Sequence, residues 1–157
     1  PFDGHTTPTM AANLPEDPQG VTRALPRDQA ASAAVDISDS DAAFVEKDVS
    51  VARFRKTPYA ARIQQLDGDS ATFDFSPWEG AVDFVFVDGA HTYEYVMSDT
   101  ERALKLLRGG RGVIVWHDYD KRTGQDVPAA LHELRERRPE FADIRHIFGT
   151  SLVFKVF

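Results

Sequence analysis

The chain has 157 residues, enough for one domain's core, and it lacks cysteine, which excludes disulfides, thiolate metal ligands and cysteine nucleophiles. A formal net charge of −7 argues against a surface that follows nucleic-acid phosphates. No apolar run is long enough to span a bilayer, and the first residues lack the pattern of a signal peptide. We therefore expect one cytoplasmic domain over residues 1–157, with no nucleic-acid or membrane partner.

The N-terminal part of the chain carries the weaker structural signals. Residues 6–14 predict a helix, because a threonine precedes a proline at their start. A short strand is expected at Val21–Leu25. Residues 27–58 are polar and alanine-rich, and they predict only a helix around Asp41–Glu46. The alternation in Ala61–Leu66 predicts a strand that ends in a turn.

The clearest element is the sequence DFVFVDGAH at Asp83–His91. Its apolar run is too short for a typical helix and ends in an acid, a glycine and a histidine, which indicates a buried strand with polar groups at its carboxyl end. A second such strand is GVIVWHDY at Gly112–Tyr119. Between the two, apolar residues recur at helical spacing from Tyr93 to Leu107, and a Gly-Gly pair supplies the stop.

The C-terminal part predicts one more helix and two strands. Asp126 can cap a helix that closes before Pro139. Ile144–Phe148 and Leu152–Phe157 read as strands, and the Gly-Thr turn between them is short enough to require antiparallel pairing. The order of elements predicts an α/β fold, a three-layer, mostly parallel, Rossmann-like sheet with a C-terminal antiparallel hairpin.

Five ionisable side chains are expected where these strands end: Asp69, Asp88, His91, His117 and Asp118. In an open α/β sheet, ligands bind at the carboxyl edge of the strands. Carboxylates there can accept hydrogen bonds from ribose or amine donors, or hold a divalent cation. A histidine can take a proton from a hydroxyl near neutral pH.

Each of these residues also has a purely structural interpretation. Asp88 and Asp69 could be turn acids, since aspartate caps turns through its own side chain. His91 could simply begin the following helix. His117 and Asp118 could form a structural pair in which the carboxylate orients the ring.

Other basic side chains and several missing motifs narrow the field further. We expect three histidines to lie at the surface or to be hydrogen-bonded within the protein: His5, His132 and His146. We expect three arginines to lie on a solvated helix face: Arg135, Arg137 and Arg138. The sequence has no GxxxxGK[ST] loop, no HExxH motif and no GxSxG elbow. The commonest signatures of nucleotide hydrolases, zinc proteases and serine hydrolases are therefore absent.

Three segments together carry a family resemblance: FVDGAH at Phe86–His91 before a tyrosine-containing helix, LLRGGRGVIVWHD at Leu106–Asp118, and the closing IFGTSLVFKVF. The chain resembles the class I S-adenosylmethionine-dependent methyltransferases, in the branch whose fourth strand ends in FVDGAH. The resemblance implies S-adenosylmethionine as the cofactor. It further implies O-methylation of a small molecule or a sugar hydroxyl.

The resemblance also implies roles at the candidate active site. His91 would be the general base on the acceptor hydroxyl, with Asp88 and His117 as the other catalytic side chains. Asp88 and Asp118 would hold a magnesium ion that orients the acceptor. Methyl transfer depends mainly on aligning the nucleophile with the methyl carbon, so positioning is the main task of these residues.

For the cofactor, the resemblance implies binding by Gly4, Asp69, Ser70 and Asp88. Gly4 lies in the tail of a glycine-rich loop, and Asp69 and Ser70 match a position near the adenine. The family's first strand is missing, so we expect an N-terminally truncated chain whose neighbouring strand edges are unpaired. Ala24 stands where the family has a ribose-binding acid. We therefore expect this chain to bind the cofactor weakly.

Two other functions remain open. Ala24 is compatible with a methyltransferase-like module that no longer catalyses and serves in binding or structure. A dinucleotide-binding Rossmann domain would need a complete GxGxxG and an acid after the second strand, and neither is present. The sequence is also compatible with a homo-oligomer.

Overall fold

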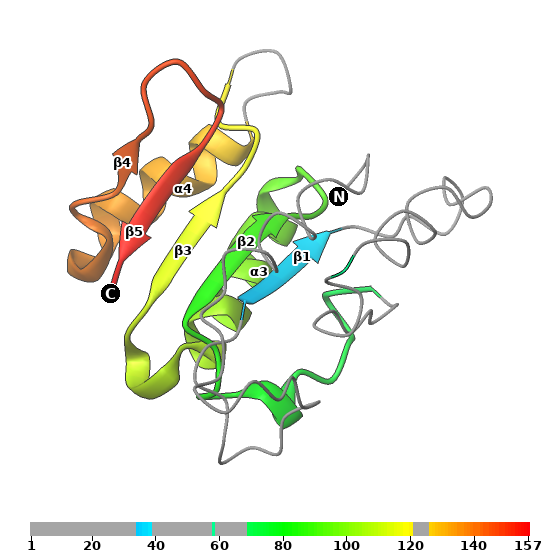
Figure 1. Ribbon diagram of the computed structural model, residues 1–157. Coiled ribbons are helices and arrows are strands. Elements are labelled where there is room, and N and C mark those ends of the chain that lie inside the picture. The colour runs from blue at the N-terminus through cyan, green and yellow to red at the C-terminus, as the bar shows by residue number, and fades with distance from the viewer. Residues whose placement is uncertain (1–33, 39–57, 59–68, 121–125) are drawn as a thin grey trace.

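A computed structural model of the protein describes residues 34–38, 58, 69–120 and 126–157. These residues form a five-stranded sheet in the order β1-β2-β3-β5-β4 (Figure 1). The strands are β1 (Ala34–Ser38), β2 (Phe84–Asp88), β3 (Val113–Trp116), β4 (Arg145–His146) and β5 (Val153–Val156). β1, β2 and β3 run parallel, whereas β5 is antiparallel to both β3 and β4. The fold is α/β with a mixed sheet, compatible with a Rossmann-like architecture.

β1 corrects two expectations from the sequence. Residues 27–58 predict no strand, yet residues 34–38 form one that pairs with β2 over five residues. The edge of β2 that faces away from β3 is therefore paired, so the expected open edge beside β2 does not exist. The alternation in AVDIS is only five residues long, and its strand conformation depends on the neighbouring backbone of β2.

Two helices lie on the same face of the sheet (Figure 1). They are α3 (Tyr93–Leu106) and α4 (Asp126–Arg137), and their bounds confirm the helices predicted from the spacing of apolar residues. Three short 3-10 turns complete the described elements: η2 (Ser76–Trp78), η3 (Arg108–Gly110) and η4 (Pro139–Phe141). The third layer stays a prediction, since the described helices cover one face.

The alternation of side chains along β2 and β3 builds the core beneath these helices. Val85, Ile114 and Trp116 are buried against the helix layer. The Trp116 indole N–H donates to the Thr100 hydroxyl at 2.9 Å, and that hydroxyl donates to the Val96 carbonyl at 2.7 Å. This chain of hydrogen bonds satisfies the polar atoms that the large ring brings into the core.

Gly112 sets the close approach of β3 to the chain before β2. Its φ is +151°, and a Cβ atom there would lie 2.5 Å from the Asp83 carbonyl oxygen. The Phe157 N–H donates to the Gly112 carbonyl at 2.8 Å, which continues the pairing of β3 with β5. Only glycine fits this position without a shift of the backbone.

Other expectations fall outside the described residues. These are the helix over 6–14, the strand at Val21–Leu25, the helix around Asp41–Glu46 and the strand at Ala61–Leu66, all of which stay predictions. β4 and β5 are each shorter than the strands predicted for the C-terminal segments. Within the part of the chain that the structure describes, no helix combines the length and apolarity needed to cross a membrane.

Candidate active site

The parallel pairing of β2 with β3 brings the first two site residues together. Val87 is the register partner of Trp116, and the His117 N–H donates to the Val87 carbonyl at 3.0 Å. Asp88 and His117 therefore leave the sheet side by side, with Asp88 Oδ1 3.3 Å from His117 Nδ1. The structure confirms that the two signature strands end at one edge.

Asp118 joins the two histidines of the site. Its Oδ2 lies 2.8 Å from His117 Nδ1 and 2.5 Å from Nε2 of His91, which comes from the loop between β2 and α3. Asp118 has a φ of 58°, and it is the one non-glycine residue in the described part of the chain with a positive φ. Such a conformation costs about 1–3 kcal/mol and clusters at functional sites. Here it turns the carboxylate between the two imidazole rings.

The contact with Asp118 indicates which nitrogen of His91 carries the proton. An ionised carboxylate only accepts hydrogen bonds, so His91 carries a proton on Nε2. His117 Nδ1 lies 2.8 Å from the same carboxylate oxygen but makes no hydrogen bond to a described residue. In neutral His91, Nδ1 is then the atom that can take a proton. The imidazole is 46% exposed, so an acceptor hydroxyl can reach it.

The surroundings of Asp88 favour its neutral form. Burial raises the pKa of Asp88 above its ordinary value of 3.8, and the Asp118 carboxylate raises it further. The neighbouring His117 acts in the opposite direction. Holding Asp88 ionised among these groups costs free energy, which a bound cation would recover.

Asp69 shows the turn role that its sequence context allowed. Its Oδ1 accepts the Ala71 N–H at 2.8 Å and the Tyr95 hydroxyl at 3.2 Å. Tyr95 belongs to the first turn of α3, so this contact holds the Asp69 loop beside the helix that follows β2. Ser70 lies next to Asp69 and is partly buried. The roles of both residues in cofactor binding stay predictions, and Gly4 and Ala24 lie outside the described residues.

Sequence reasoning missed Ser151. Its hydroxyl lies 3.4 Å from His117 Nε2, and its carbonyl accepts the Tyr119 N–H at 2.9 Å. Because a hydroxyl can donate or accept a hydrogen bond, Ser151 can pair with Nε2 in either neutral tautomer of His117. Because β5 runs antiparallel to β3, the residues just before β5 lie beside the end of β3. The antiparallel pairing predicted from the sequence could therefore have identified Ser151.

The parallel strands β2 and β3 of this mixed sheet bring carboxylates and imidazoles to their carboxyl edge, which is where ligands bind in Rossmann-like folds. A family model described as "Methyltransferase domain" matches residues 3–119, well over half of the chain. The chain belongs to this family of class I S-adenosylmethionine-dependent methyltransferases, and the particular branch that the resemblance indicated stays a prediction. No curated protein and no solved structure matches the chain.

Proposed function

We propose that the protein transfers the methyl group of S-adenosylmethionine to a hydroxyl of a small molecule or sugar. The observation that carries this proposal is the contact of Asp118 with both His91 and His117 beside Asp88. A methyltransferase of this family needs a group that removes the hydroxyl proton and groups that hold the acceptor still. The cluster offers both at the edge where the ligand is expected.

In this proposal, the acceptor oxygen forms a bond with the methyl carbon while the bond from carbon to sulfur breaks. The acceptor proton passes to His91 Nδ1, and S-adenosylhomocysteine leaves as a neutral thioether. Asp118 holds Nε2–H of His91 and so keeps the ring in the tautomer that can accept. His117 and Asp88, which lie beside Asp118, would help to position the acceptor.

The same cluster fits a divalent cation. Asp88, His117 and Asp118 each offer one ligand atom, and these atoms lie within 4.8 Å of one another. The two carboxylates are suitable donors for magnesium or manganese, whereas an imidazole is a more usual ligand of softer metals such as zinc. We propose that Asp88 and Asp118 hold Mg²⁺ with His117 beside them. The positive charge of the ion, when bound, would orient the acceptor hydroxyl and favour loss of its proton.

Asp88→Asn tests the cation site through stability. Because the pKa of Asp88 is raised on folding, folded protein binds more protons and loses stability as the pH rises through that pKa. Asparagine cannot ionise, so without metal we expect the variant to melt at a higher temperature than wild type at about pH 7. The difference should vanish below the ordinary pKa of 3.8, where Asp88 is neutral. Melting curves measured across this range check the sign.

The metal arm of that experiment uses the same two proteins. Mg²⁺ or Mn²⁺ should raise the melting temperature of the wild-type chain, since a ligand that binds only the folded state stabilises it. It should raise that of Asp88→Asn far less. Glu136→Gln, on α4 and away from the cluster, removes one carboxylate as a control and should respond like wild type. An equal metal response in all three proteins would remove the cation from the proposal.

We further infer that S-adenosylmethionine is bound with the help of Gly4, Asp69, Ser70 and Asp88. The support is the family membership, together with the placement of Asp69 beside α3. We also propose that helices cover the second face of the sheet. We further propose that the protein is cytoplasmic and forms a homo-oligomer. Nucleic acid and membrane are not expected partners, given the charge of −7.

Calorimetric titration tests the proposed cofactor. We expect S-adenosylmethionine and S-adenosylhomocysteine to bind one common site, weakly, and NAD⁺ not to bind. Ala24→Asp restores an acid that can accept from ribose hydroxyls, so it should tighten binding by about tenfold, the worth of one charge-assisted hydrogen bond. If neither protein binds either compound, the proposal fails, and a non-catalytic methyltransferase-like module becomes the better description.

A further inference from the structure

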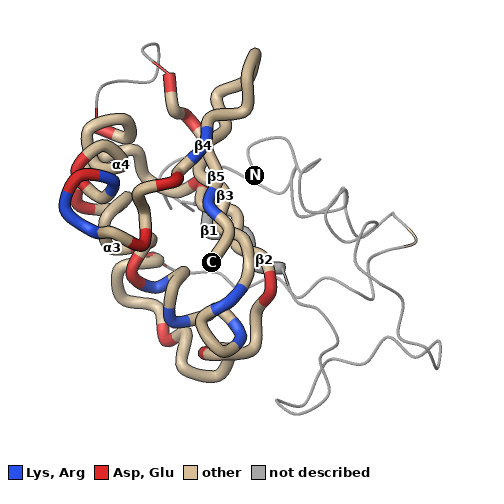
Figure 2. The backbone as a smooth tube through the Cα atoms, turned by 90° about the vertical axis from the view of Figure 1, so that its left-hand side faces the viewer, with Lys and Arg blue, Asp and Glu red and all other residues tan. Residues whose placement is uncertain are grey.

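Basic and acidic residues lie close together in the region of α3 and α4 (Figure 2). Three arginines, Arg135, Arg137 and Arg138, stand at or just after the end of α4 and differ in their ion pairs. Arg137 pairs with Glu133 at 2.8 Å, and Arg138 pairs with Glu140 at 2.8 Å and also with Glu101. Arg135 makes no ion pair within the described part of the chain. Arg135 and Arg137 are exposed, as the predicted solvated face requires, and Arg138 is half-buried.

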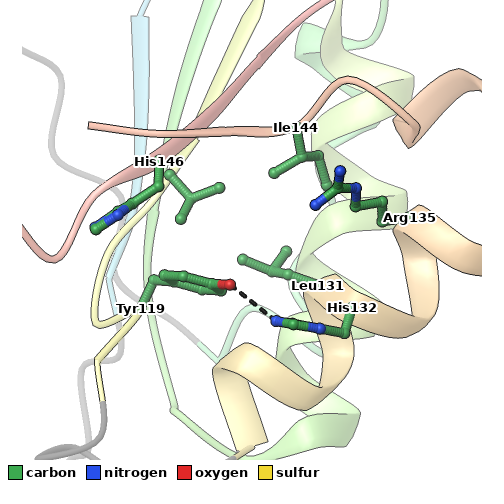
Figure 3. A pocket seen from close by; sticks show the side chains of 7 residues that line it. Tyr119, Leu131, His132, Arg135, Ile144 and His146 are labelled. Atoms are coloured by element: carbon green, nitrogen blue, oxygen red, sulfur yellow. Dashed lines mark hydrogen bonds between the residues drawn. The ribbon is translucent and has the colours of Figure 1, made fainter. Parts of the chain in front are cut away.

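Arg135 borders a hollow of about 70 Å³ between α4, β4 and the segment after β3 (Figure 3). Its basic and aromatic rim and its apolar floor include Tyr119, Leu131, His132, Arg135, Ile144 and His146. The volume is several times the minimum of about 10–15 Å³ that one water molecule requires. Although the chain has a net charge of −7, none of the lining residues is acidic.

Hydrogen bonds hold the rim in place and leave donors available. Tyr119 Oη lies 2.8 Å from His132 Nε2, and the two rings are nearly parallel, at 10°. Whichever atom of this pair carries the shared proton, one spare donor remains, either the tyrosine O–H or the histidine Nδ1–H. His146 Nε2 donates to the Thr150 carbonyl at 2.7 Å, which fixes its ring on the opposite side of the hollow from Arg135 (Figure 3).

We propose that this hollow is a second ligand site, distinct from the Asp88–Asp118 cluster, which binds a small oxyanion. The Arg135 guanidinium offers a pair of N–H donors in the geometry that carboxylate and phosphate oxygens prefer. The Tyr119–His132 pair supplies a further donor. Leu131 and Ile144 form an apolar floor that supports the part of the ligand carrying the anion.

Titration with two probes tests the site and separates the two sources of the anion. Benzoate presents a carboxylate on an apolar ring, and inorganic phosphate presents an anion without one. The ring signals of His132 and His146 are followed by NMR at fixed pH and at an ionic strength held constant with sodium chloride. We expect a saturable shift of both histidines with at least one probe. Saturation by benzoate alone would define a carboxylate site, and by phosphate alone a phosphate site.

Arg135→Gln should weaken the binding of that probe by roughly three- to tenfold, a discounted value for an exposed cation. Arg137→Gln is the matched control, because it removes an arginine of the same helix that is already paired with Glu133. It should bind the probe like wild type. The proposal is overturned if neither probe gives a saturable shift, or if both variants bind like wild type, or if both lose affinity equally.

Discussion

His91→Ala should lower turnover by roughly a hundredfold to ten-thousandfold, the usual contribution of a general base. The reason is geometric: His91 Nε2 is held by Asp118, which leaves Nδ1 to receive the acceptor proton. Affinity for S-adenosylmethionine should stay nearly unchanged, because the imidazole acts on the chemical step. Release of S-adenosylhomocysteine at saturating donor gives the turnover, and calorimetry gives the affinity.

Asp118→Asn provides the informative comparison for this prediction. Asparagine tolerates the positive φ of 58° at this position better than most residues, so the backbone is retained. The variant keeps the His91 imidazole but loses the carboxylate that accepts from its Nε2–H. We expect a smaller loss of turnover than in His91→Ala. Near-normal turnover of His91→Ala from about pH 6 to 9 would return His91 to a structural role at the start of α3.

Gly112→Ala should lower the free energy of unfolding by about 2–5 kcal/mol, through a steric clash added to backbone strain. The new methyl group would lie 2.5 Å from the Asp83 carbonyl oxygen and 2.8 Å from Leu107 Cδ2. The carbonyl cannot simply move aside, since it accepts the Val113 N–H at 3.0 Å between β2 and β3. Chemical denaturation followed by circular dichroism measures the effect.

Gly110→Ala is the matched control for this variant. Gly110 also has a positive φ, at +72°, but nothing lies within 4 Å of the position of an added Cβ. The free energy of unfolding of Gly110→Ala should fall by only about 1–2 kcal/mol, because the variant adds backbone strain without a steric clash. If Gly112→Ala is no less stable than Gly110→Ala, the close approach of β3 to Asp83 is not what requires glycine there.

The strongest elements were predictable because their signals are local. Both β2 and β3 are continuous apolar runs that end abruptly in polar residues, and α3 is followed by glycines at the expected place. β1 was missed because five alternating residues in a polar, alanine-rich stretch carry little signal of their own. Its conformation comes from pairing with β2, a non-local interaction that propensity does not report.

The candidate site divides in the same way. Parallel strands with polar ends predicted that Asp88 and His117 meet at one edge. The contact of His91 with Asp118 depends on the left-handed backbone conformation of Asp118, which no pattern in the sequence predicted. The approach of Ser151 to His117 depends on the register of β5 against β3. The sequence could not distinguish Arg135 from Arg137 and Arg138, because the difference lies in the carboxylates that pair with the latter two.

Transfer of an isotopically labelled methyl group from S-adenosylmethionine to sugar and phenolic hydroxyls tests the central claim most directly. Mass spectrometry of the product locates the methyl group, and release of S-adenosylhomocysteine gives the stoichiometry. We predict a methyl ether formed in equal amount to S-adenosylhomocysteine by the wild-type chain, and its loss in His91→Ala. A methyl group found on nitrogen or carbon, or a donor left intact with every hydroxyl acceptor, would contradict the proposed function.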